Sequence, residues 1–101
     1  MDFVIKEGDT RNALIGTLEP AQGSVLDIAS VNFRMSDTLH KNLINRLVDG
    51  GVLPEAIVVF APTEVAKAGN YLGEFVATYT DGKTETFPND DYIKIMILRR
   101  A

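Results

Sequence analysis

The sequence predicts an all-β fold, an antiparallel sandwich of two sheets with about seven or eight short strands and at most one short helical turn. Two observations lead to this prediction. Residues 69–98 contain three successive segments with strand character, separated by the turn sequences Asp-Gly and Pro-Asn-Asp. The residues before Gly69 contain further short apolar segments with turn residues between them. A three-stranded meander cannot bury its apolar face alone, so these earlier segments should supply the opposing sheet.

Length and composition restrict the classes of protein that the chain can represent. Its 101 residues suffice for one domain, and 46% hydrophobic with 24% charged residues is ordinary for a folded, soluble protein. The absence of cysteine excludes disulfides and thiolate chemistry, and the net charge of −4 implies no basic surface for nucleic acid or membrane. The N-terminus has no charged leader followed by an apolar run, so we expect a soluble protein made in the cytosol.

Three short strands are expected in the first part of the chain, at residues 3–5, 13–18 and 31–35. In the second of them Leu14, Gly16 and Leu18 share one face. In the third, Val31, Phe33 and Met35 alternate with polar residues, which is the clearest strand pattern in this half. Residues 19–24 form a loop by composition, and residues 25–28 form a short apolar link.

Residues 36–51 are open to two interpretations. Ser36 or Asp37 could cap a helix, apolar residues from Leu39 to Val48 lie at helical spacing, and Gly50 could end it. The alternative is a turn over residues 37–41 followed by a strand over residues 42–48. Propensity alone slightly favours the helix.

The next segments return to strand character. Residues 56–60 form a compact apolar run rich in β-branched residues, which indicates a buried strand. Residues 62–69 then have Thr and Glu near a potential helix start and Gly at the end. They predict one helical turn, over residues 63–68, that crosses between the sheets.

The hairpin at Asp81-Gly82 determines which side chains face each other in the C-terminal meander. Over residues 71–79 the large apolar residues fall at odd positions, so one face of this strand should be buried. A two-residue loop sets Phe87 opposite Val76, whereas a three-residue loop with Gly82 in the left-handed conformation sets it opposite Phe75. We favour the second, because it pairs two aromatic rings on the buried face.

The chain ends with a second turn and a third strand. Pro88-Asn89-Asp90 has turn composition, and residues 92–98 are strongly β-prone with Ile93, Ile95 and Ile97 on one side. With this register, Phe33, Phe75, Phe87 and Ile95 should be buried together.

The sequence contains no recognisable constellation for catalysis, metal binding or cofactor binding. The acidic residues Asp81, Glu85, Asp90 and Asp91 do not follow a calcium-loop spacing, and His40 has no second imidazole or cysteine. The serines lack the context of a nucleophile. Tyr71, Tyr79 and Tyr92 could stack on sugar rings, but two of them fall on the core face. The hydroxyl of Tyr71 is placed to bond to upstream backbone, as in a tyrosine corner.

The order of the motifs resembles a known family. The opening Phe3-Val4-Ile5-Lys6-Glu7-Gly8-Asp9-Thr10, the strand from Val31 to Met35, and the pattern AGNYLGEFVATYTDGKTETFPNDDYIKIMI resemble the N-terminal domain of the phage baseplate upper protein family. They also resemble small tail-associated phage proteins that consist of that domain alone. The resemblance implies an immunoglobulin-like β-sandwich, and it favours the strand over the helix for residues 42–48.

The resemblance also implies a function. We expect a non-enzymatic structural virion protein of the tail or baseplate, made in the host cytoplasm, that binds copies of itself and other structural subunits. The alternative is an immunoglobulin-like module that binds host-surface carbohydrate or decorates a capsid. The strand over residues 3–5 could be an unguarded sheet edge or be exchanged between subunits. Contacts between the basic end and the acidic turn of a neighbour would be self-complementary; the candidate contact residues are Asp90, Asp91, Lys94, Arg99 and Arg100.

Overall fold

The structure, a computed structural model, describes residues 2–21 and 23–100 and contains eight strands and two 3₁₀ turns in that part of the chain. The predicted all-β class is confirmed. The strands are β1 (Asp2–Lys6), β2 (Leu14–Thr17), β3 (Ile28–Asp37), β4 (Asn42–Leu47), β5 (Glu55–Val58), β6 (Gly69–Tyr79), β7 (Thr84–Phe87) and β8 (Ile93–Leu98). The 3₁₀ turns are η1 (Val25–Asp27) and η2 (Pro62–Val65).

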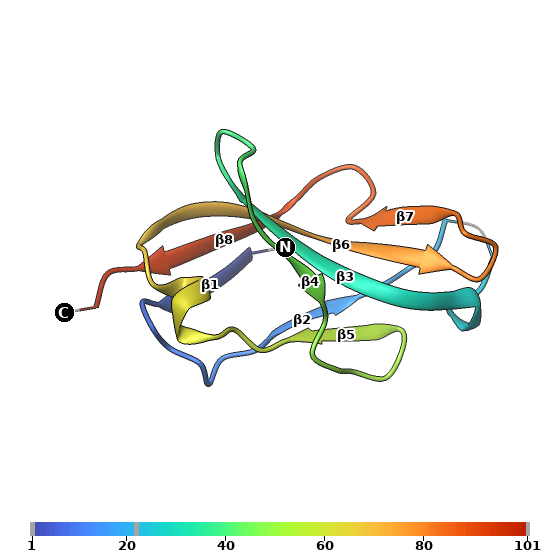
Figure 1. The fold of residues 1–101 in the computed structure, drawn as a ribbon, viewed down its shortest axis with the longest axis horizontal. Coiled ribbons are helices and arrows are strands. Elements are labelled where there is room, and N and C mark those ends of the chain that lie inside the picture. Colours follow the sequence, from blue (N-terminus) through green and yellow to red (C-terminus); the bar gives the residue numbers. More distant parts are fainter. Residues whose placement is uncertain (1, 22, 101) are drawn as a thin grey trace.

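The strands form two sheets (Figure 1). Six of them form the large sheet, with the order β1-β8-β6-β3-β4, and β2 and β5 form the small sheet. The long strand β6 is central: β3 pairs along one side of it, while β8 and β7 pair successively along the other. Residues 69–98 thus form the middle of the large sheet, but the predicted meander is wrong, because β7 and β8 both pair with β6 and not with each other.

One part of the predicted topology is wrong, because the large sheet is mixed and not antiparallel. β1 pairs with β8 in parallel, with Phe3 beside Ile95 and Ile5 beside Ile97. The alternation of apolar residues shows which face of a strand is buried but not which way its neighbour runs. Since β1 and β8 lie far apart in the sequence, no tight turn forces them to be antiparallel.

The hairpin prediction is confirmed. Phe75 pairs with Phe87, and Tyr79 N–H donates to the carbonyl of Lys83 at 2.8 Å, which leaves three residues in the loop. Gly82 has a φ of 87°, the left-handed conformation that glycine adopts without steric cost. As expected, the odd-numbered positions of β6 face the core from Tyr71 to Ala77.

Residues 42–47 form a strand, so the helical interpretation of this segment is wrong. β4 pairs antiparallel with β3, and the turn between them includes His40 at a φ of 64°. The register shifts between Met35 and Ser36, which marks a bulge in this pair. Pairing with β3 outweighs the slight local preference for helix, as tertiary context commonly does.

The remaining elements differ from prediction mainly at their ends. β5 ends at Val58, two residues before the predicted limit, and β8 begins at Ile93. The predicted helical turn is the 3₁₀ turn η2, and the apolar link before β3 also contains a 3₁₀ turn, η1. Predicted boundaries rest on composition, which changes more gradually than backbone pairing does.

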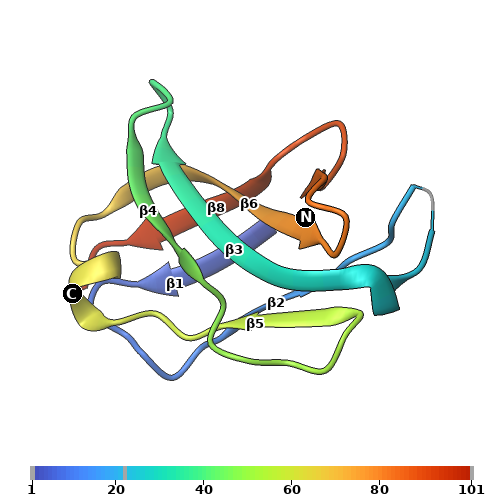
Figure 2. The same ribbon diagram turned by 45° about the vertical axis from the view of Figure 1, so that its right-hand side comes forward.

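The small sheet packs against the buried face of the large sheet (Figure 2). A Cβ added to Gly16 on β2 would lie 2.3 Å from the Phe75 ring, so the two sheets approach as closely as a glycine permits. The Phe60 ring lies 5.7 Å from that of Phe33 and 5.8 Å from that of Phe3. Phe33, Phe75, Phe87 and Ile95 are all buried, as predicted.

Candidate protein interface

The five predicted contact residues do not form one surface. Asp90 and Asp91 are exposed in the loop before β8, whereas Arg99 and Arg100 are exposed after its far end. Lys94 lies between them on the face of the large sheet that points away from the small sheet. The acidic and basic groups are therefore separated along β8, by roughly 20 Å at the usual rise per residue of a strand.

Arg100 is also engaged within its own chain. Its Nη2 donates to Oδ1 of Asp9 at 2.6 Å, and its backbone N–H donates to Oε1 of Glu7 at 2.9 Å. This backbone hydrogen bond from Arg100, together with one from Ala68, lowers the pKa of Glu7. These contacts attach the end of β8 to the loop after β1.

β8 is not an edge strand, because it lies between β1 and β6. β1 is an edge of the large sheet, as predicted, but the expectation that it lacks guards is wrong, because Asp2 and Lys6 flank it with charges. β4, the opposite edge, contains the bulge and carries Arg46. Charges and bulges are the usual guards against edge-to-edge pairing.

The small sheet has one covered edge and one free edge. On β5, Ile57 exchanges backbone hydrogen bonds with Gly50 at 2.9 and 3.3 Å. The N–H of Val59, which follows β5, donates to Oδ2 of Asp49 at 2.6 Å. The segment that follows β4 thus covers β5.

β2 is the free edge. Leu18 N–H donates to the carbonyl of Pro54, so the alternation of an antiparallel ladder directs the backbone groups of Ile15 and Thr17 away from β5. These groups have no backbone or side-chain hydrogen-bond partner among the described residues. The strand reads Leu-Ile-Gly-Thr and carries no charge, and the Ile15 side chain is 46% exposed.

A groove of about 540 Å³ lies beside β2. We call it the β2 groove; its lining residues are Ile15, Gly16, Thr17, Glu19, Phe75, Phe87, Pro88, Asn89, Asp90 and Ile93. One wall is thus the free edge of the small sheet, and the other is the loop that joins β7 to β8. Of the predicted contact residues, only Asp90 lines it.

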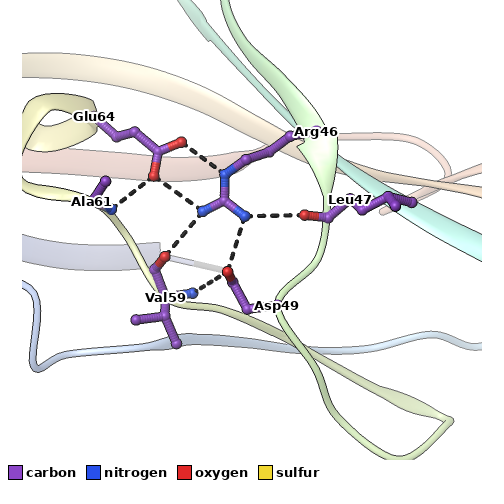
Figure 3. A network of polar contacts seen from close by, with 6 residues as sticks. All are labelled: Arg46, Leu47, Asp49, Val59, Ala61 and Glu64. Atoms are coloured by element: carbon purple, nitrogen blue, oxygen red, sulfur yellow. Dashed lines mark hydrogen bonds and ion pairs between the residues drawn. The ribbon is translucent and has the colours of Figure 1, made fainter.

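On the side of the small sheet opposite β2, Arg46 connects β4 to the segment after β5 and to η2 (Figure 3). Its guanidinium donates two hydrogen bonds to the Glu64 carboxylate at 2.8 and 3.0 Å, one to Asp49 at 3.0 Å, and one each to the carbonyls of Leu47 and Val59. All five donors of the guanidinium are thereby used. This cluster is not visible in the sequence, where the spacing of Arg46 and Asp49 is its one local signal.

The network shifts the pKa values of its members. The hydrogen bond from Arg46 lowers the pKa of Glu64 and raises that of Arg46 itself. Burial opposes ionisation of Asp49, but the hydrogen bonds from Val59 and Arg46 together outweigh it, so the pKa of Asp49 is lowered. All three groups are therefore charged at neutral pH, and the cluster is stabilised as a set of ions.

The tyrosines do not form a sugar-binding platform. Tyr71 is buried, and its hydroxyl donates to the carbonyl of Lys67 at 2.8 Å, as expected for a tyrosine corner. The Tyr79 hydroxyl donates to Glu85 at 2.5 Å, which raises the pKa of Tyr79 to about 12. Tyr92 lies 6.0 Å from the His40 ring beside a pit of about 70 Å³. At about 30 Å³ per water molecule this pit is too small to enclose a sugar ring.

Two other kinds of site are missing from the described part of the chain. Residues 2–21 and 23–100 contain no group of three or more His, Asp or Glu residues placed to hold a metal ion. They also contain no helix that is long and apolar enough to cross a membrane. Comparison with known protein families, with curated proteins and with solved structures finds no match for this chain.

Proposed function

We propose that this protein is a non-enzymatic structural component of a bacteriophage virion, most specifically a tail or baseplate subunit that works through contacts with other protein chains. One structural observation carries the protein-binding part of the proposal: β2 presents an uncharged, unpaired edge beside an open groove. An exposed strand edge of this kind is a template for pairing with another chain. Its partners are other tail or baseplate subunits, copies of this chain among them.

The virion part of the proposal rests on the sequence resemblance. The residues that carry it most strongly, from Ala68 to Ile97, span β6 to β8, which form the middle of the large sheet. The motif therefore covers three strands and the two turns that connect them. The virion assignment therefore depends on the sequence resemblance alone, because a fold does not determine function.

We also propose that the fold is immunoglobulin-like. Two features support this. Tyr71 at the start of β6 makes the upstream hydrogen bond of a tyrosine corner. The Phe33 ring on β3 lies 5.7 Å from Phe75, and Phe75 in turn packs over Gly16 of the small sheet. Two aromatic rings of the large sheet thus lie in the core between the sheets, where immunoglobulin domains pack a tryptophan against their disulfide.

The absence of enzymatic activity is part of the proposal. The carboxylates with lowered pKa values each accept hydrogen bonds from backbone N–H groups or from Arg46 and Tyr79, and so have structural partners. Perturbed pKa values mark functional sites only when the groups converge on a place for a substrate. Asp49 and Glu64 are instead both neutralised by Arg46, and Glu7 and Glu85 lie in two other parts of the fold, bound to Arg100 and Tyr79.

Purified phage particles provide the test. The protein should be found in density-banded virions by mass spectrometry, and gold-labelled antibodies against it should mark the tail end in electron micrographs. Labelling of the head would indicate capsid decoration instead. A protein that is made during infection but is missing from washed particles would contradict the structural role.

A further inference from the structure

We propose that the β2 groove binds an extended, cationic segment of a partner chain, which adds to the small sheet as a third strand beside β2. This inference rests on the proposed assembly function and specifies the chemistry of the partner. The segment alternates apolar and polar side chains and carries Lys or Arg at its ends. Strand addition of this kind obtains affinity from main-chain hydrogen bonds and specificity from the side chains on either side.

The first argument is the hydrogen-bonding capacity of β2. Ile15 and Thr17 direct their N–H and carbonyl groups toward the groove, and these groups have no partner in the described residues. They lie two residues apart, which is the spacing at which an added strand forms successive pairs of hydrogen bonds. The other edges are less suitable: charges flank β1, a bulge interrupts β4, the segment after β4 covers β5, and on β7 the carbonyl of Thr86 already accepts a hydrogen bond from Asn89 Nδ2.

The second argument is the shape of the groove. Its volume of about 540 Å³ lies between β2 and Pro88-Asn89-Asp90, above Phe75, Phe87 and Ile93. These three floor residues are at most 5% exposed, so a guest strand buries little additional apolar surface there. Most of its affinity then comes from main-chain pairing and from contact with Ile15. An isolated peptide should bind weakly, and a segment tethered within an assembly should bind much better through its high effective concentration.

The third argument is charge. Glu19 and Asp90 line the groove from opposite walls, and neither forms an ion pair within the described residues. No Lys or Arg lines the groove, and the whole chain has a net charge of −4. Complementary charge across an interface speeds association and selects among partners. A cationic segment fits this site, and an acidic one is repelled.

The test uses the intact protein labelled with ¹⁵N and a blocked synthetic peptide, Lys-Val-Thr-Val-Thr-Val-Lys, followed by NMR. We expect the amide signals of Ile15 and Thr17 to shift on titration and their hydrogen exchange to slow. The matched peptide with Glu at both ends should bind at least about fivefold more weakly, since two favourable charge contacts become repulsive.

Three variants sharpen the result. Glu19→Lys, an exposed residue without ion-pair partners, should weaken binding of the cationic peptide by about fivefold. Ile15→Pro removes an outward N–H but no hydrogen bond to β5, so the fold should be kept. The cationic peptide should then no longer shift the amide signal of Thr17. Asp2→Lys makes the same charge change on the outer face of the large sheet, and should leave binding unaltered.

The inference is overturned if neither amide responds to about 1 mM cationic peptide, the range of the weakest specific binding. It is also overturned if both peptides bind equally, or if the two amides shift with protein concentration alone, which would assign the edge to a second copy of this chain. The virion assay does not depend on this groove. A protein found in particles that fails the peptide test therefore loses this inference only.

Discussion

Arg46 closes one side of the small sheet with five hydrogen bonds, whereas the opposite side, along β2, has no ion pair and no covering segment among the described residues. On the closed side, the outward N–H groups of Ile57 and Val59 are both satisfied. On the open side, the equivalent groups of Ile15 and Thr17 are not. The same small sheet thus presents one completed edge and one available edge.

The two sides also differ in the interactions that hold them. On the closed side a charged cluster joins four chain segments, and each carboxylate also accepts a backbone N–H. On the open side the small sheet is held by apolar packing, with Gly16 directly over Phe75. A domain of this size that needs one sheet edge for a partner can leave that edge free only if the core beneath it and the opposite edge are stable.

The largest effect should come from the core beneath the open side. Phe75→Ala removes a ring that packs against Gly16 and Phe33 and lies opposite Phe87 in the ladder; the loss should cost about 3–5 kcal/mol, close to the whole stability of a small domain. Thermal unfolding followed by circular dichroism measures this. A variant that melts within a degree or two of the parent would show that the two sheets do not depend on this contact.

The next largest effect should come from the closed side. Arg46→Met should cost about 2–3 kcal/mol, because it leaves the Glu64 carboxylate without its two charged hydrogen bonds in a partly buried place. Arg34→Met is the control. Arg34 pairs with Glu74 at the same 2.8 Å, but its side chain is 50% exposed, so the loss should be at most about 1 kcal/mol. If urea unfolding shows that Arg46→Met and Arg34→Met lose the same unfolding free energy, the Arg46 cluster is no stronger than an ordinary surface ion pair.

Close packing under the open side can be tested by adding a methyl group. Gly16→Ala places a Cβ 2.3 Å from the Phe75 ring and should cost about 1–3 kcal/mol through overpacking. Gly50→Ala, where nothing lies within 4 Å, is the matched control and should change the melting temperature little. Similar melting temperatures for both variants would mean that the two sheets separate easily at this point.

The ionic nature of the closed side predicts a dependence on pH. The pKa of Glu64 is lowered from 4.5 and that of Asp49 from 3.8. A lowered pKa in the folded state means that the stabilisation is complete above the unfolded value and is lost as pH falls through the folded value. The parent should therefore lose stability below about pH 4.5 more steeply than Arg46→Met does. Parallel pH profiles of the unfolding free energy would count against the cluster as a source of acid sensitivity.

Much of the fold could be predicted because its information is local. Alternation identified the buried face of β6, and the glycine at position 82 identified the three-residue loop and hence the pairing of Phe75 with Phe87. The parallel pairing of β1 with β8 could not be predicted in this way, because it joins residues about ninety positions apart with no linking turn.

The candidate interface was harder to predict for the same reason. The uncharged run Leu14–Thr17 marks a strand without guards, but the sequence does not show that it has a neighbour on one side only. The Arg46 cluster needs Glu64 and Val59, which approach only after β4 and η2 are in place. The acidic residues before β8 and the basic residues after it can be read from the sequence. That the length of β8 separates the two groups is a property of the fold.

The smallest effect on stability, and the sharpest test of the open edge, should come from a single charge placed on it. Ile15→Lys puts an ammonium group on the half-exposed, outward side of β2, where it should change the unfolding free energy by no more than about 0.5 kcal/mol. A lysine on an edge strand opposes pairing with another chain. Association with the cationic peptide Lys-Val-Thr-Val-Thr-Val-Lys, followed through the amide signal of Thr17 at several salt concentrations, should therefore weaken in this variant. Val4→Lys on β1 provides the control, since Val4 is also about half exposed but Asp2 and Lys6 already guard its strand. If both lysines reduce association equally, the guarded and the free edge behave alike, and the contrast between the two sides of the molecule has no bearing on assembly.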